Sequence, residues 1–237
     1  MAAGQALAAE VKVAVAANFT EPAKEIAARF KARTGHDATL SFGSSGQFFA
    51  QIANGAPYEV FLSADAERPR KAEAEGLGVA GSRFTYATGR LVLYSKTPGL
   101  VDARGAVLKS GRFRKIAIAD PRTAPYGEAA VETMRKLGVE AQLRPKLVQG
   151  ASITQAYQFV DTGAAEVGFV ALSQLAGATG GSRWVVPAAL HTPIDQQAVL
   201  LKTGAGNAAA TSFMAFLKGA EAKAIIRRYG YEVPRRP

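Results

Sequence analysis

Val11-Lys12-Val13-Ala14-Val15-Ala16-Ala17 is a short run rich in β-branched side chains, and Asn18 follows it directly. β-Branched residues favour strands, whereas Asn is a preferred N-cap of helices. Over Pro22–Phe30 the apolar residues then recur at helical spacing. The segment therefore predicts a strand that leads straight into a helix, with Asn18 as the cap.

The same order of strand, turn and helix recurs along the chain. Further strands are predicted over residues 38–42, 60–62, 90–95, 115–119 and 167–170. Helices are predicted over 47–54 and 127–137, and one or two amphipathic helices over 208–229. Strands that alternate with helices in this way predict an α/β fold with mainly parallel sheets.

Size and composition fit a globular protein. The chain has 237 residues, of which 48% are hydrophobic, enough for one large domain or for two lobes with a core each. No apolar run approaches the roughly 20 residues that a membrane span needs, which predicts a soluble protein. Residues 1–9 are typical either of the small-residue end of a secretory leader or of a disordered tail.

The formal charge of +10 suggests nucleic acid, anionic membrane or small anions as partners. Lys and Arg are nevertheless scattered along the chain, with local concentrations at residues 112–115, 227–228 and 235–236. They form no continuous basic helix and no platform of interleaved aromatic residues. The pattern indicates a solvated surface, and we expect no nucleic-acid partner.

Four predicted turns between a strand and a helix are rich in small or capping residues. They are residues 16–18, 43–46, 125–127 and 150–153. Ligands of open α/β sheets bind at such turns, where backbone N–H groups and the positive end of the helix dipole suit an anion. Asn18, Ser44 and Ser45 add side-chain donors, and none of the four turns carries Lys or Arg.

A site built from neutral donors favours a fully deprotonated tetrahedral dianion. It disfavours monohydrogen phosphate, whose buried O–H would lack an acceptor, so sulfate, molybdate and tungstate remain as candidates. Taken singly, each turn is better explained by an ordinary helix cap than by a ligand contact. The Gly-Ser-Ser-Gly turn lacks the Gly-Lys-Ser or Gly-Lys-Thr ending of a nucleotide-binding loop.

Nothing in the sequence points to catalysis. His36 and His191 lie in turn-like segments and are expected to be exposed, and two isolated His without Cys offer no metal-ligand spacing. Carboxylates such as Asp65, Asp120 and Asp161 lie near turns without an evident pairing for acid/base work. We therefore predict no catalytic residue, no protein-ligated metal and no cofactor.

The most specific stretch is Asn54-Gly55-Ala56-Pro57-Tyr58-Glu59-Val60-Phe61-Leu62-Ser63-Ala64-Asp65. It resembles the Gly-Ala-Pro, apolar strand and Ser-Ala-Asp signature of the molybdate-binding receptors of bacterial ABC importers, which belong to the two-lobed periplasmic binding proteins. Residues 16–20, 41–46, 119–127 and 228–231 resemble the same family in order and spacing. The resemblance extends from about Val11 to Tyr231.

The resemblance also implies the binding residues. The oxyanion would lie between the lobes, bound by Asn18 and Ser45 through side chain and main chain, and by Tyr126 and Ile153 through backbone N–H, with Ser44 as an additional donor. Many members have a Tyr where this chain has Ala171. We hypothesise that the Tyr126 hydroxyl supplies the missing contact.

The implied architecture is the type II periplasmic binding protein fold. Lobe 1 would comprise residues 10–87 and 196–237, lobe 2 residues 88–195, and two crossing segments would form a hinge. The implied protein is a periplasmic, monomeric receptor that delivers molybdate, and equally tungstate, to an ABC permease, its leader having been removed. A receptor for sulfate or another tetrahedral oxyanion, and a ligand-sensing regulatory domain, are the alternatives.

Overall fold

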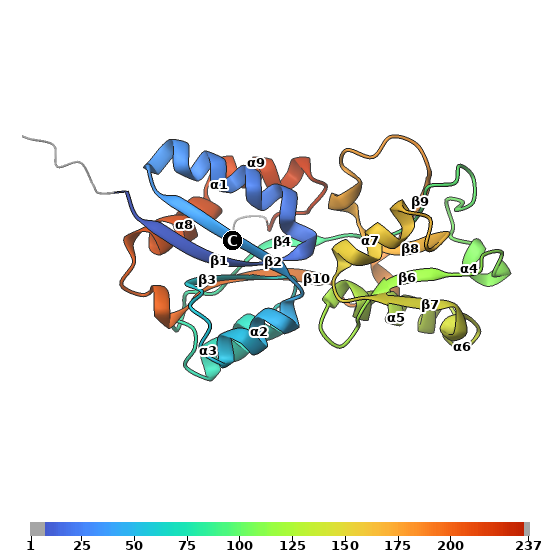
Figure 1. Cartoon of the computed structure of the whole chain (residues 1–237), viewed down its shortest axis with the longest axis horizontal. Helices are drawn as coiled ribbons and strands as arrows, with labels where there is room; N and C mark the ends of the chain where they lie inside the picture. Colours follow the sequence, from blue (N-terminus) through green and yellow to red (C-terminus); the bar gives the residue numbers. More distant parts are fainter. Residues whose placement is uncertain (1–7, 235–237) are drawn as a thin grey trace, which may run out of the picture.

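The computed structural model describes residues 8–234 and contains two five-stranded sheets at opposite ends of its long axis (Figure 1). Of the expected leader remnant or tail over residues 1–9, residues 1–7 lie outside the described part. Ala9 is attached to the first sheet, because its N–H donates to His36 Nδ1 at 3.1 Å and its carbonyl accepts from Asp37 N at 2.9 Å. Residue 9 is therefore part of the fold, which corrects the expectation of a free tail there.

The first sheet has the strand order β2-β1-β3-β10-β4. Its strands are β1 (Glu10–Ala16), β2 (Asp37–Gly43), β3 (Val60–Ser63), β4 (Phe84–Gly89) and β10 (Ile194–Leu200). Strand β10 is antiparallel to both of its neighbours, and the other four strands share one direction.

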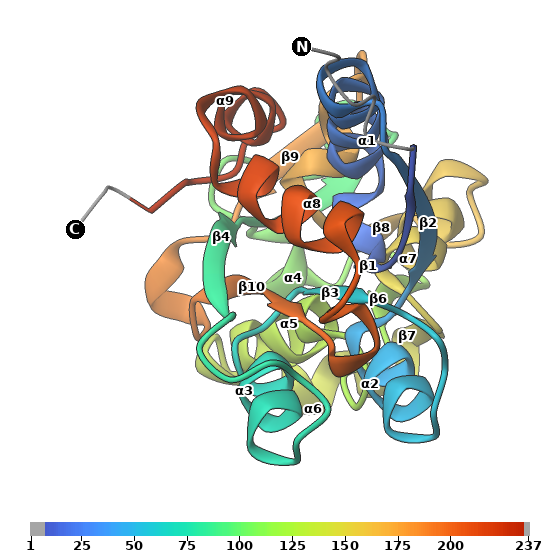
Figure 2. The same cartoon turned by 90° about the vertical axis from the view of Figure 1, so that its left-hand side faces the viewer.

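Helices cover both faces of this sheet (Figure 2). One face carries α1 (Thr20–Thr34), α8 (Ala208–Lys218) and α9 (Ala220–Arg228), and the other carries α2 (Ser45–Ala53) and α3 (Glu67–Ala74). The first face buries an aromatic cluster in which Phe30 packs edge-on against Phe213 at 5.3 Å between ring centroids. The 3₁₀ helices η1 (Ala17–Phe19) and η5 (Lys202–Gly204) complete this half.

The second sheet has the order β7-β6-β8-β5-β9, and only β5 is antiparallel to its neighbours. Its strands are β5 (Leu91–Ser95), β6 (Ile116–Ala119), β7 (Leu147–Gly150), β8 (Val167–Ala171) and β9 (Ser182–Val185). Its helices are α4 (Val107–Ser110), α5 (Pro125–Lys136), α6 (Glu140–Leu143), η2 (Arg144–Lys146), α7 (Ile153–Asp161), η3 (Leu172–Leu175) and η4 (Ala188–Leu190).

The chain crosses between the sheets twice. It passes from β4 through Arg90 into β5, and it returns through residues 191–193 into β10. The two antiparallel strands, β5 and β10, are the strands that follow these crossings. Four of five strands in each sheet share a direction, so the predicted two-lobed α/β fold with mainly parallel sheets and two crossings is confirmed.

Two local predictions were wrong. Asn18 does not cap α1: it lies within η1, Phe19 occupies the N-cap position, and the Asn18 side-chain amide is hydrogen-bonded elsewhere. His191, at the return crossing between η4 and β10, is buried, with 6% of its surface exposed. Within residues 8–234, no helix is long and apolar enough to span a membrane.

Candidate functional site

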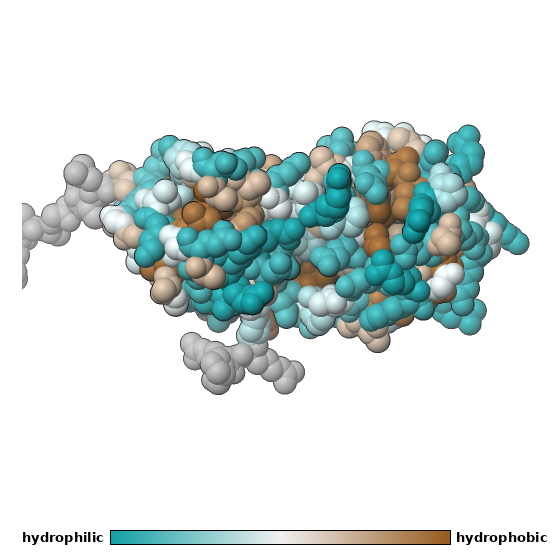
Figure 3. Space-filling model, turned by 90° about the horizontal axis from the view of Figure 1, so that it is seen from below, coloured by the Kyte–Doolittle hydropathy of each residue, from teal (hydrophilic) through white to brown (hydrophobic). Residues whose placement is uncertain are grey.

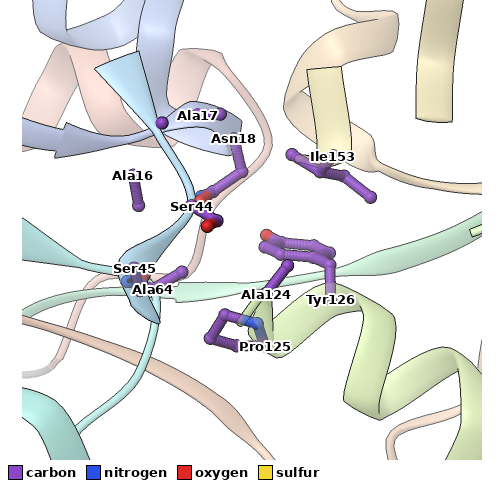
Figure 4. Close-up of a pocket in the computed structure, with 11 residues that line it drawn as sticks. Ala16, Ala17, Asn18, Ser44, Ser45, Ala64, Ala124, Pro125, Tyr126 and Ile153 are labelled. Atoms are coloured by element: carbon purple, nitrogen blue, oxygen red, sulfur yellow. Dashed lines mark hydrogen bonds between the residues drawn. The ribbon is translucent and has the colours of Figure 1, made fainter. Parts of the chain in front are cut away.

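A small cavity lies where the two sheets face each other (Figure 4). The first half contributes Ala16, Ala17, Asn18, Gly43, Ser44, Ser45 and Ala64, and the second half contributes Ala124, Pro125, Tyr126 and Ile153. The cavity has a free volume of about 10 Å³, which is room for about one water-sized sphere. The two halves thus meet around a small space.

All five residues selected from the sequence reach this cavity: Asn18, Ser44, Ser45, Tyr126 and Ile153. They come from four turns separated by up to 135 positions along the chain (153 − 18). The turns meet because each follows the carboxyl end of a strand, and these ends of both sheets point to the junction.

Helix starts supply backbone donors to the cavity. Ser45 and Ile153 are the first residues of α2 and α7, and Tyr126 is the second residue of α5. N–H groups in a first helical turn have no carbonyl partner within their helix, and the helix dipole places partial positive charge there. Pro125 has no N–H, so Tyr126 provides the first amide of α5.

The two serine hydroxyls differ in their partners. Ser45 Oγ accepts the N–H of Ala64 at 2.9 Å, which leaves its own proton free to donate. Ser44 is only 3% exposed, and its hydroxyl has no hydrogen-bond partner within residues 8–234. A buried hydroxyl without a partner costs about 1–3 kcal/mol. Ser44 is therefore a donor that a bound acceptor would satisfy.

Asn18 uses its side chain away from the cavity. Its Nδ2 donates to Gln196 Oε1 and to Tyr231 Oη, both at 2.9 Å, so both amide hydrogens are engaged. The expectation that Asn18 donates to the ligand through its side chain thus conflicts with the bonds observed. Its backbone N–H is the donor that it can offer to an anion.

The Tyr126 hydroxyl has a hydrogen-bond donor beside it. Its oxygen accepts a hydrogen bond from Gln196 Nε2 at 3.3 Å, and burial raises the pKa of Tyr126 well above its ordinary value. A Cβ on Gly89 would lie 2.1 Å from this oxygen, so only glycine fits beneath the ring. This hydroxyl accepts from Gln196 of β10, and Ala171 is fully buried at the end of β8. The hypothesis that the Tyr126 hydroxyl supplies the contact missing at Ala171 stays a prediction.

A larger groove of about 320 Å³ adjoins the cavity and shares Ala64 and Pro125 with it. Five carboxylates line this groove: Asp65, Glu67, Glu128, Glu132 and Asp195. Burial, together with the charge of Glu132, raises the pKa of Glu128. The groove therefore repels anions, whereas the described residues around the smaller cavity include no charged side chain.

Sequence reasoning missed four polar residues behind the cavity: Tyr86, Ser173, Gln196 and Tyr231. The pair Gln196-Gln197 within an apolar segment was the one local signal, because buried polar side chains need partners. Within the described range, no cluster of His, Cys, Asp and Glu could hold a metal ion.

Comparison with known proteins agrees with this geometry. The family model of bacterial extracellular solute-binding proteins matches residues 11–232. The molybdate-binding protein ModA of Rhodobacter capsulatus is 62% identical over 95% of this chain and 89% of its own length. ModA of Azotobacter vinelandii is 57% identical, over 95% and 91% respectively.

Solved structures share the fold. The Azotobacter vinelandii periplasmic molybdate-binding protein superposes with a TM-score of 0.92 at 45% identity, covering 95% of this chain and all of the other. The sulfate-binding protein SubI from Mycobacterium tuberculosis reaches a TM-score of 0.77 at 13% identity, covering 95% and 87%. The second match reflects the fold alone.

Proposed function

Since the chain belongs to the bacterial extracellular solute-binding protein family, and within it to the molybdate-binding ModA proteins, we propose that it binds molybdate in the cavity between its sheets. It is a periplasmic binding protein of an ABC importer and not an enzyme, and molybdate is its ligand rather than a cofactor. The partner that receives the ligand is the permease of the importer.

The observation that carries the choice of site is a buried, unpartnered Ser44 hydroxyl beside three helix starts. We assign the anion contacts to the backbone N–H groups of Asn18, Tyr126 and Ile153, and to Ser44 and Ser45. Hydrogen bonds to a charged group contribute about 1.5–3 kcal/mol each, and a helix start adds about 0.3–2 kcal/mol. Several such terms give tight binding without a cationic side chain.

The donor set also supports selection among anions. Ser45 Oγ already accepts from Ala64 N, so it turns its proton toward the ligand. A protonated oxyanion such as monohydrogen phosphate would bring a donor to a site of donors and lose a hydrogen bond. Molybdate and tungstate have nearly the same size, and both are larger than sulfate. We therefore propose that the first two bind alike and sulfate binds poorly.

Capture requires that the two halves separate and close. We propose lobe 1 as residues 10–87 with 196–237 and lobe 2 as residues 88–195, whose boundaries fall within β4 and β10, the strands next to the crossings. A hinge there would open the cavity to solvent, and the anion would stabilise the closed state. The permease would then recognise the closed surface.

We further propose that the protein is a monomer and does not bind nucleic acid. Phe42 and Val185, each 38% exposed, are the exposed large hydrophobic residues of the described chain, and hydrophilic residues dominate the face in Figure 3. Among the basic concentrations, Arg114 pairs with Glu166 and Arg228 with Glu25. Light scattering and salt-dependent retention on DNA test both points.

A thermal-shift panel with molybdate, tungstate, sulfate and phosphate tests the function. An anion at about a thousand times its dissociation constant stabilises the protein by roughly 4 kcal/mol, which gives a large shift in Tm. We expect this shift with molybdate and tungstate and little with phosphate. A larger shift with sulfate than with molybdate would establish the sulfate receptor instead, and no shift with any anion would refute an oxyanion site.

A further inference from the structure

A closed ring of hydrogen bonds lies behind the anion cavity. Asn18 Nδ2 donates to Tyr231 Oη at 2.9 Å, Tyr231 Oη donates to Ser173 Oγ at 2.9 Å, and Ser173 Oγ donates to the Asn18 carbonyl oxygen at 2.8 Å. All three residues are buried, with 3% to 6% of their surface exposed. The Asn18 carbonyl oxygen, 2.7 Å from Tyr231 Oη, is a second acceptor for the single Tyr231 proton. When that proton points to Ser173, each hydroxyl donates one bond and accepts another, an arrangement in which the bonds strengthen one another.

The ring joins the two halves of the molecule. Asn18 follows β1, and Tyr231 packs in the core of the first sheet, whereas Ser173 lies in η3 directly after β8 of the second sheet. Two of its three bonds therefore cross the junction between the halves.

A second pair of bonds supports the ring from the crossing strand. Gln196 of β10 accepts from Asn18 Nδ2 through Oε1 at 2.9 Å and donates through Nε2 to Tyr126 Oη at 3.3 Å. Asn18 thus has both side-chain hydrogens and its carbonyl oxygen engaged. Its remaining backbone donor, the N–H, belongs to the turn that lines the cavity.

We infer that Tyr231 and Ser173 are positioning residues for anion capture: they form a latch that closes with the lobes and fixes Asn18 so that its backbone serves the anion. This inference rests on the proposed function. Neither residue lines the anion cavity, so their contribution acts through Asn18 and through the closed state. The latch is neutral and adds no charge near the anion, because a phenol with the ordinary pKa of 10.0 is protonated at physiological pH and burial raises the pKa of Tyr231 further, to about 12.

The test compares two tyrosines of the same environment. Tyr231→Phe removes the hydroxyl that bridges the halves, and Ser173→Ala removes the other hydroxyl of the ring. Tyr86→Phe is the matched control, because the Tyr86 hydroxyl is equally buried but bonds only to Ser63 O and Gln196 Oε1 of the first sheet. Molybdate affinity is measured by calorimetry, dissociation rate by stopped-flow fluorescence, and ligand-free stability by thermal unfolding.

We expect Tyr231→Phe and Ser173→Ala to weaken molybdate binding about 5- to 150-fold, the effect of one or two lost hydrogen bonds of the closed state. Most of the change should lie in the dissociation rate. The Tyr86→Phe control should lower ligand-free Tm at least as much as Tyr231→Phe, yet change the dissociation rate by less than about 3-fold.

The outcomes separate the two hypotheses. Wild-type protein that binds no tetrahedral oxyanion would overturn the proposed function and the latch with it. Wild-type protein that binds molybdate while Tyr231→Phe binds equally well would overturn the latch alone. An equal loss of affinity in Tyr86→Phe and Tyr231→Phe would also overturn it, since the network would then be merely structural.

Discussion

Gly46 lies in close contact with the opposite half, so an added methyl group tests whether closure is needed for binding. Its N–H donates to the Thr123 carbonyl at 2.8 Å, across the junction. A Cβ at this position would lie 2.8 Å from Thr123 Cα and 3.1 Å from Thr123 O. Because carbon atoms prefer a separation of about 3.5–4.0 Å, Gly46→Ala forces the backbones apart by roughly 0.7 Å in the closed state.

The expected magnitude follows from this overlap. Overpacking of a well-packed contact costs about 1–3 kcal/mol, and here the cost falls on the closed state alone. We expect Gly46→Ala to weaken molybdate binding about 5- to 150-fold. Gly46 is also the second residue of α2, and Ala in place of Gly stabilises a helix by up to about 1 kcal/mol. The ligand-free, open protein should therefore be as stable as wild type or more stable.

Calorimetry measures the expected loss of molybdate affinity, and thermal unfolding without ligand measures the expected equal or greater stability of the open protein. Gly206→Ala is the control, because a Cβ on Gly206 meets no atom within 4 Å and its φ is not positive. Molybdate binding by Gly46→Ala at wild-type affinity would refute the reasoning. The contact between Gly46 and Thr123 would then not belong to the bound state.

Two further changes test single groups. Ser44→Ala removes a buried hydroxyl that has no partner among the described residues, so we expect the ligand-free Tm to stay equal or rise. Calorimetry should show molybdate binding about 10- to 150-fold weaker. Unchanged affinity would exclude Ser44 from the site. Burial raises the pKa of Tyr231 from 10.0 to about 12. Between pH 10 and about 12, the folded protein therefore keeps the Tyr231 proton, whereas the unfolded chain releases it. The contribution of Tyr231 to the free energy of unfolding is complete below pH 10 and is lost as the pH rises through about 12. In denaturant titrations across this range, Tyr231→Phe should lose stability with pH less steeply than wild type, and equal slopes would contradict the assignment.

Local pattern determined the elements with strong periodicity. The run from Val11 to Ala16 lies in β1, and the amphipathic stretch from Ala208 became two helices separated at Gly219. Periodicity sufficed there because each segment buries one continuous apolar face against its sheet. The turn at residues 43–46 was also predicted from local sequence. Its small residues permit the close approach that Gly46 makes to Thr123.

Of the strands next to the crossings, β5 was predicted over residues 90–95, whereas β4 and β10 were not predicted. Strand β10 contains Asp195, Gln196 and Gln197 among apolar residues, so its pattern does not resemble a central strand. Those polar side chains are tolerated because partners from distant segments satisfy them: Asp195 accepts from Thr88 Oγ1 at 2.7 Å, and Gln197 accepts from Arg83 at 2.7 Å. No local rule supplies such partners.

For the site, the sequence by itself determined which turns carry donors, because parallel strands bring their carboxyl ends to one edge. Only the tertiary structure decided how each donor is used. Asn18 reads locally as a helix cap, yet its amide bonds to Gln196 and Tyr231, 178 and 213 positions away. Gln196 and Tyr231 lie beside Asn18 because the chain returns to the first sheet at its second crossing. Side-chain hydrogen bonds depend on proximity in space, which the neighbours in sequence do not determine.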